Sequence, residues 1–177
     1  MGNPSQLEGE KAFLAAYDEY GDAIFRFLAM KISDRETARD LTQETFTRAW
    51  DFCVEGGQIR EWRPFLYRTA YHLVVDTYRK KKAVSLDALI EDDGFAVSDE
   101  NVGAKSTVSH AEMSRVRKGI DKLDEIYRDI VLLRYVEDLP PKDIARITGL
   151  SENVVSVRIH RGVEKLRTIL GPNTKNI

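Results

Sequence analysis

Residues 139–170 read LPPKDIARITGLSENVVSVRIHRGVEKLRTIL and describe two helices joined by a tight turn. Pro140 and Pro141 are favourable at the start of a helix and unfavourable inside one. Gly149 follows where the chain must turn sharply, because glycine tolerates a positive φ. Ser151 is a favourable N-cap for the next helix. The stretch therefore predicts a short helix, a glycine turn and a longer second helix.

The predicted second helix has an apolar side and a polar side. Small or apolar residues recur there at helical spacing: Val155, Ile159, Gly162, Leu166 and Ile169. The opposite side carries Asn153, Ser156, Val157 and His160, and the flanking cations are Arg158, Arg161, Lys165 and Arg167. This is the plan of a helix-turn-helix, whose second helix enters the major groove of DNA. An ordinary helical hairpin is the alternative, and the small Ala145, placed where two helices would cross closely, argues against it.

Length and composition exclude several classes of protein. A chain of 177 residues forms one domain or two small ones. No apolar run approaches the ~20 residues of a membrane span, and the first residues lack the basic and apolar regions of a secretory signal. Cys53 is the single cysteine, so no intrachain disulfide forms. We therefore expect a cytoplasmic protein without membrane insertion.

The net charge of −2 hides an asymmetry along the chain. Residues 83–112 contain seven acidic residues and one lysine, whereas residues 113–177 carry a net positive charge. Proteins that bind DNA alone are usually basic overall, because neutralisation of phosphates drives their affinity. The sequence therefore predicts weak DNA binding by the free chain, or a partner that contributes charge.

The first half of the chain predicts helices and no strand. Apolar residues at spacings of three and four indicate an amphipathic helix over residues 10–31: Phe13, Tyr17, Tyr20, Ile24, Phe27 and Leu28. Ser33 and Glu36 form a capping box, so a second helix begins near Asp34 and ends before Gly56 and Gly57. Its expected buried face is Ala38, Leu41, Thr45, Ala49 and Phe52.

A third helix is predicted from Pro64 to the basic run Arg79–Lys82, which suits the C-terminal end of the helix dipole. Its inward residues are Phe65, Leu66, Thr69, Ala70, Leu73 and Val74. Residues 83–112 lack periodicity and predict a linker with one short helix near residues 86–90. Two more helices are expected over residues 113–123 and 124–136, the second burying Ile126, Ile130, Leu133 and Val136.

The sequence offers no site for catalysis. It contains no glycine pattern of a P-loop or a dinucleotide fold. It also lacks Cys and His at zinc spacing, and its histidines are scattered. Paired acids such as Asp92 and Asp93 fall in the predicted linker. We therefore expect no enzyme activity, no metal and no cofactor.

Two further motifs carry a family resemblance. Arg39–Trp50 reads RDLTQETFTRAW, and Trp62–Lys82 reads WRPFLYRTAYHLVVDTYRKKK. Together with the helix-turn-helix, these strings resemble bacterial RNA polymerase sigma factors of the extracytoplasmic-function (ECF) group, over residues 10–82 and 113–170. The resemblance implies an all-α fold with a sigma-2 domain at 10–82, an acidic linker at 83–112 and a sigma-4 domain at 113–172.

The resemblance also implies the function and the partners. Such a protein binds core RNA polymerase through the clamp helices of the largest subunit and through the flap, responds to stress, and directs initiation at promoter DNA. An anti-sigma factor is a further partner that the resemblance leaves open. The implied polymerase-binding residues are Asp40, Gln43, Glu44, Thr47 and Trp50. In the helical pattern, Phe46 and Trp50 form an aromatic pair at the edge of this face, with Trp50 partly in the core.

The resemblance implies two sets of residues that contact DNA: one set, on the third helix and the loop before it, at the −10 element, and a second set at the −35 element. On the third helix, aromatic and cationic side chains that suit unpaired bases and phosphates share the outward face: Arg68, Tyr71, His72, Val75 and Arg79. The loop over residues 54–62 would supply a pocket for a flipped base through Gln58, Ile59, Arg60 and Trp62. The residues expected at the −35 element are Ser151, Asn153, Ser156, Val157, Arg158, His160 and Arg161. A solvated helix face is the alternative for the third helix.

The chain departs from the family pattern at four positions. The family usually has Asn at His72 and Arg or a similar residue at Tyr71, and it commonly has Thr and Lys at Val154 and Ser156. The promoter sequence therefore cannot be carried over from relatives. Two other functions stay open at this point: a helix-turn-helix regulator that acts without polymerase, and a module that binds polymerase or an anti-sigma protein but no promoter.

Overall fold

The computed structural model describes residues 4–32, 34–87 and 110–171. The elements within these ranges are helices, with no strand among them, which confirms the expected all-α fold. The chain divides into two compact units, Met1–Glu100 (unit 1) and Asn101–Ile177 (unit 2). Over the described ranges, the helices are too short or too polar to cross a membrane.

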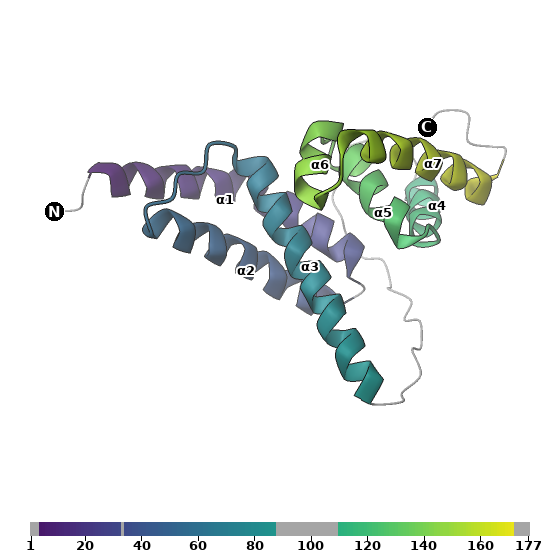
Figure 1. The fold of residues 1–177 in the computed structure, drawn as a ribbon, viewed down its shortest axis with the longest axis horizontal. Coiled ribbons are helices and arrows are strands. Elements are labelled where there is room, and N and C mark those ends of the chain that lie inside the picture. Colours follow the sequence, from purple (N-terminus) through teal and green to yellow (C-terminus); the bar gives the residue numbers. More distant parts are fainter. Residues whose placement is uncertain (1–3, 33, 88–109, 172–177) are drawn as a thin grey trace. The chain divides into compact units, whose positions relative to one another are not determined.

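Unit 1 consists of α1 (Pro4–Lys31), α2 (Arg35–Val54) and α3 (Trp62–Asp87), and each helix packs on the other two (Figure 1). The side chains that fill its core include Ile24, Phe27, Leu28, Ala38, Phe46, Ala49, Leu66, Tyr67, Ala70 and Val74. Two expected core residues are largely exposed, Tyr17 at 51% and Phe52 at 41%. Phe52 lies in the last turn of α2, where its ring covers Gly57 and contacts Phe65 instead of entering the core.

The start of α2 is confirmed, but its capping residue differs from the expectation. Asp34 is the N-cap, and its carboxylate accepts hydrogen bonds from the backbone N–H groups of Glu36 and Thr37 at 3.2 and 2.9 Å. Ser33, the expected cap, lies outside the described residues. α2 ends two residues before Gly56, which adopts a φ of 91°. The negative charge of Asp34 at the cap also stabilises α2, because it lies at the positive end of the helix dipole.

The predicted linker is helical at both ends. α3 continues to Asp87 rather than ending at Lys82, and α4 begins at His110. Residues 88–109 lie outside the described ranges, and so does most of the short helix predicted near residues 86–90.

Unit 2 consists of α4 (His110–Asp121), α5 (Glu125–Val131), the π-helical turn η1 (Leu132–Val136), α6 (Pro141–Thr148) and α7 (Glu152–Leu170). α7 packs on α4, α5 and α6. The core includes Ile120, Leu123, Ile130, Leu132, Leu133, Leu139, Ile144, Ile147, Val155 and Leu166.

The π turn explains an error in the predicted burial of residues 124–136. The backbone N–H of Glu137 donates to the carbonyl of Leu132 at 3.1 Å, five residues back. Such a turn inserts one extra residue and changes which residues face the core. Val136 is therefore 42% exposed, against expectation, whereas Ile130 and Leu133 are buried as expected. Ile126 is 51% exposed, because the buried part of α5 begins only at Asp129.

Candidate functional site

The turn between α6 and α7 has the geometry that its sequence predicts. Pro140 is the N-cap of α6 and Pro141 its first residue. Gly149 adopts a left-handed conformation with φ of 72°, and its N–H donates to the carbonyl of Ala145 at 2.9 Å. Ser151 Oγ accepts a hydrogen bond from the N–H of Val154 at 3.3 Å. These local contacts fix where α7 begins and confirm the helix-turn-helix.

The two sides of α7 separate as expected. The predicted DNA-facing residues are exposed, apart from the half-buried Arg158: Ser151, Asn153, Ser156, Val157, His160 and Arg161. The opposite side buries Val155, Gly162, Val163, Leu166 and Leu170. Ile169 was expected in this stripe but is 38% exposed. Leu170 is buried in its place, because its side chain packs against Gly119 of α4.

Gly162 sets how closely α7 approaches α5. A Cβ atom at this position would lie 2.7 Å from Cγ2 of Val131, a buried residue of α5. Val131 is β-branched and therefore stiff at its first side-chain torsion. The close approach requires glycine, and it fixes the rotation of α7 that turns the polar side outward.

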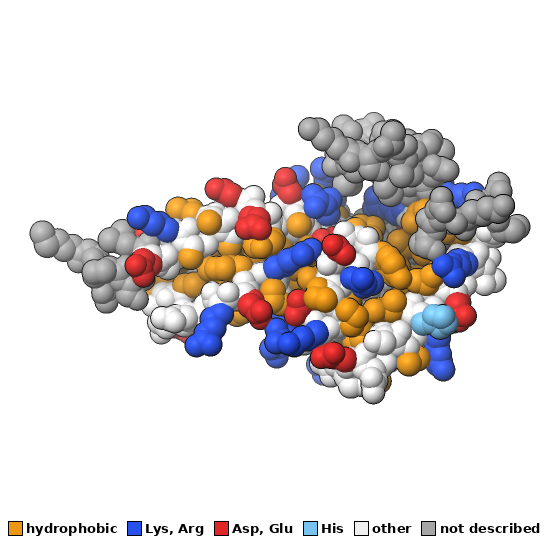
Figure 2. Space-filling view, turned by 90° about the horizontal axis from the view of Figure 1, so that it is seen from above, with side chains coloured by type: hydrophobic (Ala, Val, Ile, Leu, Met, Phe, Trp, Pro, Cys, Tyr) orange, Lys and Arg blue, Asp and Glu red, His pale blue; other side chains and the backbone are white. Residues whose placement is uncertain are grey.

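Lys165 and His160 of α7 make contacts that the sequence did not predict. Lys165 Nζ lies 3.0 Å from Asp124 Oδ2, and this hydrogen bond and the carboxylate charge raise the pKa of Lys165. Lys165 therefore contacts the start of α5, although we expected it beside the DNA-facing side. His160 Nε2 lies 3.4 Å from Glu164 Oε1, one turn along the same helix. Figure 2 shows Lys and Arg side chains of the described residues interspersed with acidic and hydrophobic ones.

The outward face of α3 carries the second predicted DNA surface. Arg68, His72 and Arg79 are exposed, and Tyr71 and Val75 are half-buried. The ammonium of Lys31, a buried residue at the end of α1, lies 5.1 Å from the centroid of the Tyr71 ring. Sequence reasoning missed Lys31, because its closeness to Tyr71 arises only from the packing of α1 on α3.

The connection between α2 and α3 is shorter than the predicted loop. Val54 is the last residue of α2 and Trp62 the first residue of α3. Gln58 and Arg60 are exposed, and Ile59 is half-buried. The Trp62 ring packs edge-on against Phe13, with centroids 6.2 Å apart. Trp62 therefore packs on α1. We expected it only to line a pocket for a flipped base.

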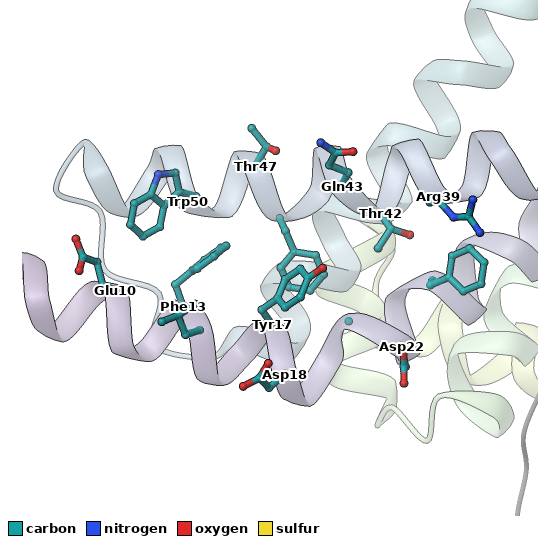
Figure 3. Close-up of a pocket in the computed structure, with 14 residues that line it drawn as sticks. Glu10, Phe13, Tyr17, Asp18, Asp22, Arg39, Thr42, Gln43, Thr47 and Trp50 are labelled. Atoms are coloured by element: carbon teal, nitrogen blue, oxygen red, sulfur yellow. The ribbon is translucent and has the colours of Figure 1, made fainter.

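Three of the five predicted polymerase-binding residues line one groove. The groove lies between α1 and α2, has a volume of about 1130 Å³, and is lined on the α2 side by residues that include Gln43, Thr47 and Trp50 (Figure 3). Asp40 is exposed outside it. Glu44 also lies outside it and forms an ion pair with Arg48, with Nε and Oε1 2.8 Å apart.

Phe13 of α1 lies at the centre of an aromatic cluster that forms part of the lining of this groove. Its ring centroid is 5.1 Å from that of Trp50 and 6.3 Å from that of Phe46. We expected Phe46 and Trp50 to form a pair at the edge of α2. Instead both rings contact Phe13, and Phe46 is buried at 3% exposure while Trp50 is half-buried, as expected.

The α1 side of the groove was not predicted at all. It includes Glu10, Leu14, Tyr17, Asp18 and Asp22. Leu14 is 61% exposed and Tyr17 51%, so apolar surface lies open beside carboxylates. One sign of this surface was present in the sequence: Leu14 is apolar and adjacent to Phe13, but it lies outside the apolar stripe of the helix. Among the described residues, no group of His, Cys, Asp and Glu is arranged to hold a metal ion.

Comparisons with known proteins identify a family for both units. Residues 16–84 match the family model of sigma-70 region 2, and residues 113–166 match that of sigma-70 region 4. The ECF RNA polymerase sigma factor SigW of Bacillus subtilis is 31% identical over 89% of this chain and 88% of that protein. The ECF sigma factor BldN of Streptomyces coelicolor is 27% identical over 90% of this chain, which spans 60% of that protein.

A solved structure shares the fold. The sigma factor RpoE of Bartonella quintana, in complex with the anti-sigma factor NepR, has a TM-score of 0.75 at 20% sequence identity, over 90% of this chain and 97% of that chain. Both sigma-70 regions are present, in order, on separate compact units. With the similarity to SigW over most of both proteins, these matches show that the chain belongs to the ECF group of sigma-70 sigma factors.

Proposed function

We propose that the chain binds core RNA polymerase and directs it to promoters that α7 reads at the −35 element and α3 reads at the −10 element. Sigma factors are non-catalytic initiation factors, and we propose that this chain likewise has no enzymatic activity and acts in the cytoplasm. The observation that carries the proposal is the outward side of α7. It keeps polar and basic residues exposed while its opposite side is locked against α5 by Gly162.

At the −35 element, the proposed reading residues lie toward the start of α7. Asn153, Ser156, Val157 and His160 would meet base edges, because the first turns of a recognition helix reach the floor of the major groove. Ser151, Arg158 and Arg161 would contact the phosphates on either side. The exposure of these side chains, with Arg158 half-buried, leaves both groups accessible to DNA.

At the −10 element, the proposed surface combines α3 with the loop that precedes it. Arg68, His72 and Arg79 would hold phosphates, and Tyr71 would stack on an unpaired base. Gln58, Ile59, Arg60 and Trp62 would surround a base flipped from the duplex. The contact between Lys31 and Tyr71 supports this role, because it fixes an aromatic ring beside a buried positive charge.

The groove between α1 and α2 is the proposed docking site for the polymerase clamp helices. Gln43, Thr47 and Trp50 line it, and Asp40 and Glu44 extend the same helix face. Exposed aromatic and apolar side chains beside polar ones are typical anchors of protein interfaces. Unit 2 would make a second contact with the polymerase flap.

Reconstitution of the full chain with core polymerase tests the proposal. Transcripts from a library of genomic fragments are sequenced at their 5′ ends, with and without the chain. We expect the chain to select start sites that share one −10 and one −35 sequence. Free chain should bind the same duplexes weakly at physiological salt, because its net charge is only −2 and phosphate binding favours basic proteins.

Two outcomes would contradict the proposal. Tight, sequence-specific duplex binding by the free chain, with no effect on the polymerase, would indicate a helix-turn-helix regulator that acts alone. Binding to core polymerase without any selected start sites would indicate a protein-interaction module.

An anti-sigma factor is the remaining partner in the proposal. RpoE, which shares the fold, is seen in complex with the anti-sigma factor NepR. A candidate anti-sigma protein qualifies if it displaces core polymerase from this chain in a competition experiment and suppresses transcription from the selected promoters.

A further inference from the structure

Two valines stand exposed on the outward side of α7, among polar and basic residues. Val154 is 39% exposed and Val157 48%, whereas Val155 between them is fully buried at 0%. Residues three apart on a helix are neighbours on one face. Because both lie near the start of the recognition helix, they belong to the part that reaches base edges in this class of motif.

The side chain of valine can recognise only one feature of the major groove. It has no hydrogen-bond donor or acceptor, so it cannot distinguish the polar edges of adenine, guanine or cytosine. The C5-methyl group of thymine is the apolar feature that base pairs present in that groove. We propose that Val154 and Val157 are specificity-determining residues that contact thymine methyl groups at neighbouring base pairs of the −35 element.

The spacing along the helix fits this pairing. Three residues advance about 4.5 Å along a helix axis, and successive base pairs are about 3.4 Å apart. The two valines would therefore address adjacent base pairs and not two distant ones. This inference rests on the proposed function, since it requires that α7 read duplex DNA.

The surroundings of the valines fit a duplex better than a protein partner. Arg158 follows Val157 directly, Arg161 lies one turn beyond Val157, and the exposed polar residues Asn153 and Ser156 each precede one of the valines. Cations beside apolar side chains match duplex DNA, whose phosphates flank a major groove that contains thymine methyl groups. Burial of Val155 and the close approach at Gly162 prevent α7 from rotating the two valines inward.

Replacing thymine by deoxyuridine tests the inference, because it removes the methyl group and leaves the base pair intact. The −35 preference of reconstituted holoenzyme is first selected from a randomised library. Binding is then measured for duplexes in which single thymines of that element are replaced by deoxyuridine. The variants are Val154→Ala and Val157→Ala. Ile169→Ala is the matched control, because Ile169 is 38% exposed at the far end of the same helix.

For the wild-type chain, we expect deoxyuridine to weaken binding about threefold to fourfold at each of two adjacent base pairs, the effect of losing one buried methyl group. Each alanine variant should lose the discrimination at one of these positions, and Ile169→Ala should retain both. Circular dichroism should show unchanged helicity, because alanine favours helices more than valine does.

The outcomes separate the inference from the proposed function. A retained −35 preference with equal binding of thymine and deoxyuridine overturns the inference alone. Discrimination that survives in both valine variants also overturns it, as does a preferred element built of G·C pairs only. A holoenzyme without any −35 preference overturns the proposed function and the inference together.

Discussion

In unit 2 a single helix, α7, carries all the residues proposed to read the −35 element, whereas in unit 1 the proposed surfaces combine α1, α2 and α3. The start of α7 is set by local contacts between Pro140 and Val154, and its outward side is fixed by one close approach, that of Gly162 to Val131 of α5. In unit 1, Phe13 of α1 contacts Phe46 and Trp50 of α2 and Trp62 of α3. The proposed surface of unit 2 therefore depends mainly on one helix and its close approach to α5, whereas the proposed surfaces of unit 1 depend on packing among three helices.

The difference predicts where substitutions act. In unit 1, a change at one packing residue should disturb both the groove and the start of α3, because they share the Phe13 cluster. In unit 2, substitutions on the exposed side of α7 should change DNA reading without changing stability.

Phe13→Ala should lower the free energy of unfolding of unit 1 by about 2–3 kcal/mol, somewhat less than the loss of a fully buried phenylalanine because Phe13 is half-buried. Trp50 and Trp62 are the two tryptophans of the chain, so urea unfolding followed by their fluorescence reports on unit 1. The control is Leu14→Ala, at an adjacent residue 61% exposed, which should cost under ~0.5 kcal/mol. Equal costs for the two variants would show that Phe13 does not organise the cluster.

Thr47→Arg should weaken assembly with core polymerase by about thirtyfold or more, because it places a long charged side chain in the groove proposed to receive the clamp helices. Arg48→Ala, at the next residue, removes the ion pair with Glu44 outside the groove and should leave assembly nearly unchanged. Co-purification and a fluorescence titration measure both, and the melting temperature controls for folding. If the two variants assemble equally well, the docking site lies elsewhere.

Arg68→Ala and Tyr71→Ala should reduce open-complex formation about tenfold or more while sparing closed-complex binding, because stacking and phosphate contacts form on unpaired DNA. A template with a pre-melted bubble should partly restore activity. Trp62→Ala is a less clear test, since its ring also packs on Phe13. Equal defects on duplex and bubble templates would assign another role to this face of α3.

Gly162→Ala should destabilise unit 2 by about 1 kcal/mol, because the clash with Val131 exceeds the gain in helix propensity. Gly21→Ala in α1 is the matched control, since a Cβ there meets no atom within 4 Å, and it should be neutral or stabilising. Far-UV circular dichroism, corrected with the fluorescence transition of unit 1, measures both. Stabilisation by Gly162→Ala would refute the tight approach of α5 and α7.

Arg161→Ala should weaken binding to all selected promoters alike. It should also reduce the steepness of the plot of log affinity against log salt concentration by about one unit, as the loss of one phosphate contact does. Asn153→Ala and Ser156→Ala should instead change which −35 sequence is preferred. A randomised −35 library transcribed by each holoenzyme distinguishes the two effects. A preference altered by Arg161→Ala but kept by the other two variants would reverse the proposed roles.

Much of unit 2 followed from the sequence because its signals are local. Two prolines, Gly149 and Ser151 define the helix boundaries through backbone preferences that hold in any context. Helical periodicity from Val155 to Leu166 then separates the buried side of α7 from the exposed one. The family motifs in α2 and α3 likewise predicted the all-α fold, because each motif is a continuous stretch of sequence within one helix.

Tertiary structure decided what depends on which helix lies opposite. Leu170 rather than Ile169 is buried because Gly119 of α4 leaves room for it, and the π turn at residues 132–136 exposes Val136. The Phe13 cluster, the α1 side of the groove and the position of Lys31 against Tyr71 join residues far apart in sequence. Periodicity gives the direction of a side chain from its own helix axis, but contacts between helices depend on their separation and crossing angle, which only packing of the whole unit determines.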